Sequence, residues 1–386
     1  MAVALAAIAA TAGAFAQSTV TLFGGLDVNY RSVHSGDNRF SGIGTDGAYS
    51  SRIGLRGTEE LGGGLKANFH LEGAVAPDAG LGASSGGLNF QRRSVLGVEG
   101  GFGSVVIGRD YTPLFGVSGV VDPFSTNGVG SSYNLLNNII STAVTAAPTT
   151  FRTVQSAVTS GASVSAAPTF AGTTWGDPSA IRMSNAIGYT SPVMSGFSVA
   201  AMYSFGNENT GSARAAGTGA SARLTYAQGP LAISFGSQAV KGGEIGTTSL
   251  AGTDRQKWIT NFLGGSYDFG ILKLSAGYKI DMLTSDAALT DRLKGTIVGV
   301  SAPVGPVVLR ASYVERRLGD DKIGNQAAVG VSYDLSKRTA VYANYADLDN
   351  EAGYGMSING TSNGGAVMST AGGRSRGLEM GVRHIF

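Results

Sequence analysis

The sequence predicts an all-β protein, a sixteen-stranded antiparallel transmembrane β-barrel with short turns at one end and long loops at the other. Three observations support this prediction. Apolar and polar residues alternate with a period of two, most alternating segments are 10 to 14 residues long, and short and long connections alternate between them. A tilted strand that crosses a bilayer needs about 9–11 residues, whereas strands in globular proteins average about 5–6.

The alternation is clear at both ends of the chain. Near the start Val20, Leu22 and Leu26 lie on one face, and near the end Met380 and Val382 do the same. Strict alternation indicates a strand with one apolar and one polar face. Sixteen segments show it, at residues 18–33, 50–61, 64–75, 90–101, 104–113, 181–192, 196–207, 220–229, 231–241, 256–269, 271–282, 292–303, 306–317, 325–335, 338–349 and 374–386.

The connections agree with a barrel that crosses a membrane. Long ones are expected at residues 34–49, 76–89, 114–180, 208–219, 242–255, 283–291, 318–324 and 350–373, and the connections between them are short. Hydrocarbon offers no hydrogen-bond partner, so a sheet in a bilayer must close on itself to pair every backbone group. Sixteen strands enclose an aqueous channel rather than a packed core, and the polar face of each strand then lines water.

Composition excludes several other classes of protein. The 386 residues include 60 Gly and no Cys, so there is no disulfide, thiolate metal site or cysteine nucleophile. The net charge of +2 gives no argument for nucleic acid. Residues 42–47 fit a dinucleotide fingerprint as a string, but a strand rather than a helix follows them. The three histidines, His34, His70 and His384, suggest no catalytic triad, so we expect no catalytic residue, cofactor or metal.

The first sixteen residues have the character of a secretory signal. They are small and apolar and end in Ala14-Phe15-Ala16, an A-x-A-like cleavage site. No Lys or Arg follows Met1, so we expect the basic start of the signal to be missing. The predicted organisation is a truncated signal peptide at residues 1–16 and a barrel at residues 17–386.

Short motifs are spread along the whole region after the signal. They are Ser18–Gly24, Ser51–Ala67, Arg92–Val98, Gly108–Tyr111, Arg182–Tyr189, Tyr333–Thr339 and Gly381–Phe386. In this order and at these spacings the chain resembles the general bacterial (Gram-negative) trimeric porin family, particularly its β-proteobacterial type. The resemblance implies a homotrimer in the outer membrane, surrounded by lipid and lipopolysaccharide. Each barrel would be a water-filled channel through which small hydrophilic solutes and ions diffuse.

The resemblance also implies a set of functional residues. The third long loop, residues 114–180, would fold inward and face a ladder of arginines. By motif match the ladder falls on Arg52 and Arg92, with Arg109 and Arg182 as neighbours, and the alternation pattern adds Arg31 and Arg56.

Two further residues carry an expected role. The terminal Phe386 resembles the aromatic signal read by the outer-membrane assembly machinery. The family's inward loop often carries an acidic Pro-Glu-Phe-Gly-Gly-like motif, but here the stretch reads Asp122-Pro123-Phe124-Ser125-Thr126. We expect Asp122 to be the acidic residue of the constriction, in a loop otherwise poor in carboxylates.

Strand phase assigns more basic than acidic groups to the lumen. Eleven basic residues are predicted to point into the lumen: Arg31, Arg52, Arg56, Lys66, Arg92, Arg182, Arg223, Lys273, Lys279, Arg310 and Arg383. Only five acidic residues are predicted to do so: Asp27, Glu60, Glu72, Asp334 and Glu379. Rings of Arg and Lys favour anions in a pore, which predicts a mild anion preference. Three alternatives stay open: a charged wall without effect on selectivity, a substrate-selective channel with a binding site at the long third loop, and a structural or adhesive role for the loops.

Overall fold

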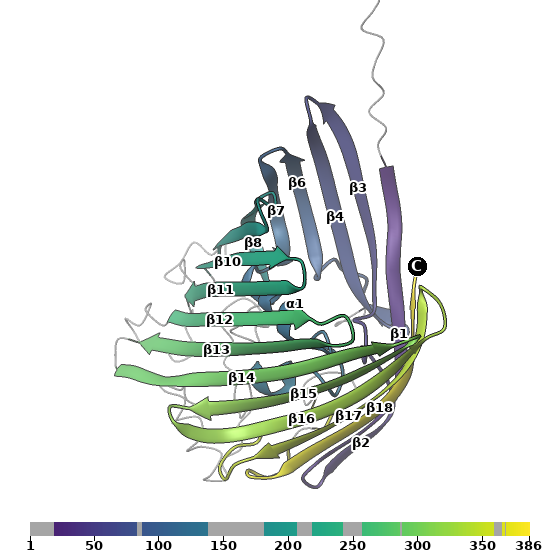
Figure 1. Ribbon diagram of the computed structural model, residues 1–386, viewed down its shortest axis with the longest axis vertical. Helices are drawn as coiled ribbons and strands as arrows, with labels where there is room; N and C mark the ends of the chain where they lie inside the picture. Colours follow the sequence, from purple (N-terminus) through teal and green to yellow (C-terminus); the bar gives the residue numbers. More distant parts are fainter. Residues whose placement is uncertain are drawn as a thin grey trace, which may run out of the picture.

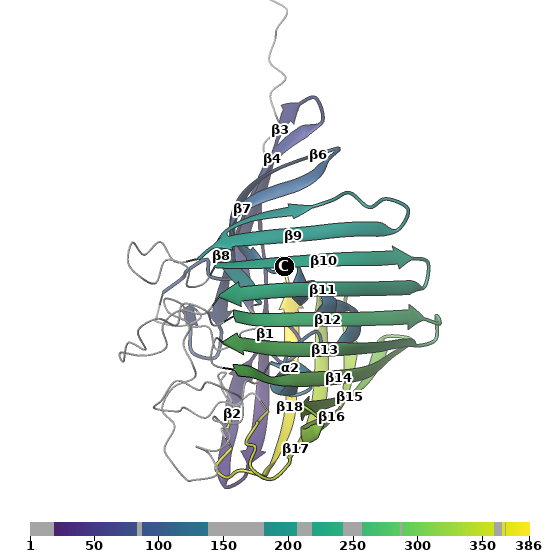
Figure 2. The same ribbon diagram turned by 90° about the vertical axis from the view of Figure 1, so that its left-hand side faces the viewer.

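The computed structural model describes residues 19–82, 87–137, 181–206, 218–241, 257–285, 288–358, 365–366 and 368–386. In this part the chain forms one antiparallel sheet that closes on itself. Figures 1 and 2 show the strands following one another around a curved wall, with short helical turns on its inner side. No helix among the described residues is long and apolar enough to cross a membrane.

Sixteen strands make up the wall, and each corresponds to one predicted segment. They are β1 (Thr19–Ser35), β3 (Arg52–Gly62), β4 (Leu65–Ala76), β6 (Arg93–Gly100), β7 (Gly103–Tyr111), β8 (Arg182–Thr190), β9 (Phe197–Phe205), β10 (Thr218–Gln228), β11 (Leu231–Lys241), β12 (Lys257–Asp268), β13 (Lys273–Ser285), β14 (Ala288–Val304), β15 (Val307–Leu318), β16 (Asp321–Asp334), β17 (Thr339–Asn350) and β18 (Arg374–Ile385). The predicted sixteen-stranded antiparallel barrel is confirmed.

The two ends of the chain close the barrel. β1 pairs with β3 along Thr19–Gly25 and with β18 along Gly25–Ser35, so the first strand joins both sides of the sheet. At the end of β18, the N–H of Phe386 donates to the carbonyl of Gly24 at 3.0 Å, and the N–H of Gly24 donates back at 3.1 Å. The terminal residue therefore extends the ladder and leaves no free edge at the seam.

Two short strands were predicted as loop. β2 (Asn38–Thr45) forms a hairpin with the second half of β1, and β5 (Leu81–Gly82) pairs with the end of β4. The hairpin turns at Gly36, whose φ of 62° is readily accessible to glycine. The loops expected at residues 34–49 and 76–89 therefore contain extra sheet, and His34, placed in a loop from the sequence, lies in β1.

The outward face of the wall is apolar, as a membrane requires. Large aliphatic side chains project from it with much of their surface exposed, including Leu96 (67 %), Ile107 (63 %) and Leu263 (52 %). Their neighbours along each strand point inward and are smaller, polar or buried. A band of exposed aliphatic residues on every side is unfavourable in water and favourable against acyl chains.

The segment after β7 folds into the barrel, and we call residues 112–137 the inward segment. It contains the 3₁₀ turn η1 (Leu114–Val117) and the single-turn helices α1 (Ser118–Val121) and α2 (Tyr133–Leu136), which contact the inner side of β10–β16. Figure 1 shows α1 within the curve of these strands. Residues 138–180 of the predicted third loop, and the predicted signal at residues 1–16, lie outside the described residues.

Glycines on the inner wall allow this close approach. A Cβ at Gly264 of β12 would lie 2.4 Å from Val121, and a Cβ at Gly295 of β14 would lie 2.4 Å from Leu136. Both distances are shorter than real carbon–carbon contacts, so a larger residue at either position would force Val121 or Leu136 of the inward segment to move. Part of the high glycine content therefore serves packing inside the barrel.

Candidate pore constriction

A line of guanidinium groups begins at β3 and β4, on the wall that faces the inward segment. Glu72 of β4 holds two of them: the Nε of Arg92 donates to its Oε1 at 2.6 Å, and the Nη1 of Arg52 lies 3.4 Å from the same oxygen. The Arg52 guanidinium also covers the ring of Tyr49, 4.2 Å from its centre. The structure thus brings together two arginines that are 40 positions apart in the sequence.

Tyr111 carries the line on to β8. Its hydroxyl accepts hydrogen bonds from the Nη2 of Arg92 at 2.6 Å and from the Nη2 of Arg182 at 2.7 Å. The Arg182 guanidinium lies 4.2 Å from the centre of the same ring. Tyr111 is the last residue of β7, and its ring stacks on Phe115 of the inward segment at 5.3 Å. The arginine line is therefore attached to the start of the inward segment.

Arg109 lies beside this line rather than in it. Its Nη1 donates to the hydroxyl of Ser184 at 2.6 Å, and its Nε donates to the carbonyl of Gln91. In the described part of the chain, neither Arg109 nor Arg182 has a carboxylate within 4.0 Å. We call this line, which consists of Arg52, Arg92 and Arg182 with Tyr111 and Glu72, together with the adjacent Arg109, the arginine ladder.

Arg31 points inward as its strand phase predicts, but it does not line water. Its Nε donates to Glu379 at 3.0 Å and its Nη2 to the carbonyl of Thr45 at 2.8 Å. The Arg31 side chain is 1 % exposed, and the other oxygen of Glu379 accepts the N–H of Val129 in the inward segment at 3.2 Å. The prediction that Arg31 belongs to the ladder is therefore corrected: it anchors the inward segment through a buried ion pair.

Asp122 has a different environment from the one expected of an acidic residue at a constriction. It is buried, and its carboxylate accepts hydrogen bonds from the N–H groups of Phe124, Thr126 and Ser132 and from the Ser132 hydroxyl at 2.6 Å. Burial raises the pKa of Asp122 above its usual range, while these donors act in the opposite direction. The geometry gives Asp122 the role of organising the inward segment, and its oxygens do not face the lumen.

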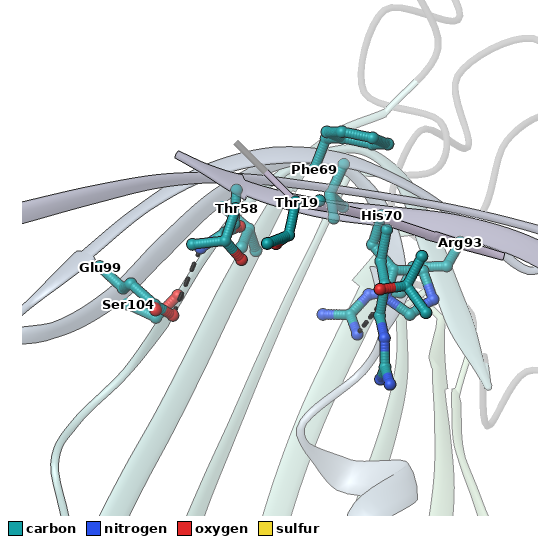
Figure 3. Close-up of a pocket in the computed structure, with 13 residues that line it drawn as sticks. Thr19, Thr58, Phe69, His70, Arg93, Glu99 and Ser104 are labelled. Carbon is teal, nitrogen blue, oxygen red and sulfur yellow. Dashed lines mark hydrogen bonds between the residues drawn. The ribbon is translucent and has the colours of Figure 1, made fainter. Parts of the chain in front are cut away.

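Arg56 lies four residues further along β3, toward the short turns. Its guanidinium sits 5.1 Å from the centre of the Phe23 ring. Arg93 of β6 lies nearby, 3.5 Å from the Nδ1 of His70, and donates to Asp110 at 2.7 Å. Arg56 and Arg93 both line a polar cavity in the wall, which Figure 3 shows.

The family of the chain is settled by comparison with known proteins. A family model described as Gram-negative porin matches residues 4–353. The chain belongs to the Gram-negative porin family.

Individual relatives agree with this membership. The porin is 35 % identical to outer membrane porin protein 32 of Delftia acidovorans, over all of this chain and 99 % of the relative. It is 28 % identical to an outer membrane porin protein of Bordetella pertussis, over 88 % of this chain and 91 % of the relative. Among solved structures, it is similar to the anion-selective porin from Comamonas acidovorans, with a TM-score of 0.74 and 31 % identity over 96 % and 100 % of the two chains.

Fold and family together give the location and the general function. The outward apolar band, the closed sheet and the porin relatives make this chain an outer-membrane barrel of the β-proteobacterial type. Like other porins it forms a water-filled channel through which small hydrophilic solutes and ions diffuse passively. Among the described residues, no group of three His, Asp or Glu side chains is arranged to hold a metal ion.

Sequence reasoning missed Arg316, and it placed Lys279 in the lumen without indicating that the inward segment would contact it. Arg316 of β15 is buried and donates to Asp281 and to the carbonyl of Leu135, each at 3.1 Å. Lys279 of β13 donates to the carbonyl of Leu136 at 3.2 Å. These cations bind the carbonyls of α2, so they fix the inward segment on the side opposite the ladder. The inward phase of Arg316 on β15 was a usable signal, since Val314 and Arg316 share a face.

Arg93 and Tyr111 were missed for a different reason. Arg92 was assigned to the lumen, and its neighbour Arg93 was then excluded by alternation. In the structure β6 begins at Arg93, so Arg92 precedes the strand and both side chains reach the lumen. Tyr111 lies in a motif of the family, but nothing in the sequence indicates that its hydroxyl would accept from two arginines.

Proposed function

We propose that this porin conducts small hydrophilic solutes and ions with a preference for anions. The observation that carries the proposal is the charge balance of the ladder: four guanidinium groups, those of Arg52, Arg92, Arg109 and Arg182, accompany one carboxylate, that of Glu72. Cationic rings in a narrow aqueous pore raise the local concentration of anions.

The opposite side of the pore supports the same proposal. In the described residues of the inward segment, Asp122 is the only carboxylate, and it is buried within the segment. The carboxylates of Glu379 and Asp281 beneath the segment are paired with Arg31 and Arg316. The positive charge of the ladder is therefore not balanced across the lumen. The similarity to a porin described as anion-selective is in keeping with this.

We further infer the assembly and the surroundings of the channel. An outer membrane protein of Vibrio cholerae with 18 % identity to this chain is described in a trimer form, in keeping with a homotrimer here. The outward apolar band would contact outer-membrane lipid, including lipopolysaccharide. Residues 1–16 would direct export, and Phe386 would be read by the assembly machinery. Gel electrophoresis of unheated and heated samples, together with chemical crosslinking, tests the trimer. A homotrimer should migrate at about three times the mass of the heated monomer.

The reversal potential tests the ion preference. Purified porin is inserted in a planar bilayer under a tenfold gradient of KCl, and the sign of the reversal potential reports which ion permeates faster. We expect the reversal potential to have the same sign as the equilibrium potential of chloride. A potential near that of potassium would contradict the proposal. Block by one solute alone would favour the substrate-selective channel instead, and folded protein without conductance would favour a structural role of the loops.

A further inference from the structure

A polar cavity of about 340 Å³ lies in the barrel wall between the arginine ladder and the short turns. It is formed where β1, β3, β4, β6 and β7 lie side by side. Figure 3 shows His70 and Arg93 at one end and Glu99 and Ser104 at the other, with Thr58 between them. We call it the Arg56–Arg93 pocket.

Aromatic and acidic neighbours hold the cations of this pocket in place. The Arg56 guanidinium lies over the ring of Phe23, and the same ring meets His70 edge to face at 5.0 Å. Asp110 accepts from the Nη2 of Arg93 at 2.7 Å and so fixes the second guanidinium. Such support reduces the conformational entropy that these long side chains would lose when a ligand binds.

The Arg56 side chain has hydrogen-bonding capacity that the described residues do not use. Within that part of the chain it makes no ion pair within 4.0 Å, and its recorded contact is with the face of Phe23. A guanidinium presents five donors in a planar fork that matches carboxylate and phosphate oxygens. The hydroxyls of Thr21, Thr58 and Ser104 line the same cavity and supply neutral donors.

The other end of the pocket limits what can enter. Glu99 lies there, and its carboxylate accepts from the Nδ2 of Asn68 at 3.4 Å. A long anion would bring its own negative charge close to Glu99. The cavity volume of about 340 Å³ is much larger than the roughly 30 Å³ that one water occupies in the liquid. A small anion therefore fits beside Arg56 with part of its hydration shell.

We propose that the Arg56–Arg93 pocket binds a small oxyanion, a phosphate or carboxylate group, on the short-turn side of the ladder. The inference rests on the proposed anion preference, because a cation-selective pore would not deliver anions to this site. After an anion has left the ladder, the pocket offers it a second binding position. Two weak sites in series allow an anion to be held and still released.

Block of the chloride current by added oxyanion tests the pocket. Single-channel currents are recorded in dilute KCl while inorganic phosphate, or acetate in a parallel series, is added. We expect saturable block of the wild-type channel by at least one of the two, and the comparison identifies which oxyanion chemistry is preferred. Absence of saturable block by both would overturn the proposal, while the reversal potential would still report on the ion preference separately.

Two variants locate the block. Arg56→Gln should raise the half-blocking concentration about tenfold, the effect expected from losing one charged hydrogen-bonding group. Lys66→Gln is the matched control, because Lys66 belongs to the same wall and pairs with Glu60 at 2.8 Å but does not line the pocket. It should change the half-blocking concentration less than twofold. Equal effects of the two variants, or none from Arg56→Gln, would place the block elsewhere and refute the inference.

Discussion

Replacing Arg182 by Gln offers a direct measure of how the ladder acts on ions. Glutamine can still donate a hydrogen bond to Tyr111, so the change removes charge and leaves a polar side chain in place. Arg182 suits this purpose because no carboxylate of the described chain lies within 4.0 Å of it, whereas Arg52 and Arg92 share Glu72. Its removal therefore takes away a charge that no ion pair offsets.

The expected size of the effect follows from Coulomb's law. A monovalent anion about 4 Å from a guanidinium in water is attracted by about 1 kcal/mol, and a monovalent cation is repelled by the same amount. Since about 1.4 kcal/mol corresponds to a factor of ten, the occupancy of anions at this point should fall about fivefold, and the ratio of anion to cation permeability should fall by between about fivefold and about thirtyfold. At 1 M salt the Debye length is about 3 Å, and the effect should shrink to less than about twofold.

Reversal potentials at low and high salt measure both numbers. Arg338→Gln is the matched control, because it removes the same charge from an exposed residue in the short turn between β16 and β17. Arg182→Lys should remain close to the wild type at low salt. The reasoning is refuted if Arg182→Gln leaves the low-salt ratio unchanged, or if Arg338→Gln lowers it by the same factor.

Three further predictions concern the fold. Leu224 faces outward and Thr225 faces the lumen, so Leu224→Lys should lower the free energy of unfolding in lipid vesicles by about 2–4 kcal/mol and Thr225→Lys by much less. Equal losses would contradict the assignment of faces. Gly264→Ala should lower the free energy of unfolding by about 1–3 kcal/mol and increase open-channel noise, since its Cβ would meet the inward segment at 2.4 Å. The control Gly265→Ala should behave as wild type, because the nearest atom to its Cβ would be 3.4 Å away. Burial raises the pKa of Asp122, so the folded chain holds the proton of this carboxyl group more tightly than the unfolded chain does. The contribution of this group to stability is therefore present at low pH and is lost as the pH rises through the folded pKa. Asp122→Asn has no such proton and should show a flatter dependence of unfolding free energy on pH; an unchanged slope would argue against this origin.

The barrel could be predicted from sequence because lipid on one side and water on the other impose a period of two on every spanning strand. The same rule fails beyond the membrane, where both faces of a hairpin are wet. That is why β2 was predicted as a loop.

The candidate site was harder to predict than the fold. Strand phase states which way Arg31 points, but it carries no information on its buried partner Glu379, which also binds the inward segment. For Asp122, residue type and loop position suggested a pore-facing carboxylate, whereas the local turns direct four donors at it. Contacts between distant segments, such as Tyr111 with Arg92 and Arg182, depend on register and loop path, which a single sequence does not specify.

Tyr111 has a consequence for any attempt to redesign this channel. One side chain both ends β7 against Phe115 and accepts from Arg92 and Arg182. The position of the inward segment, which sets the width of the pore, and the orientation of the arginines, which sets the electric field in the pore, therefore depend on the same residue. A shortened or displaced third loop would enlarge the opening and, at the same moment, remove the support of the tyrosine that orients Arg182, whereas Glu72 would still hold Arg92.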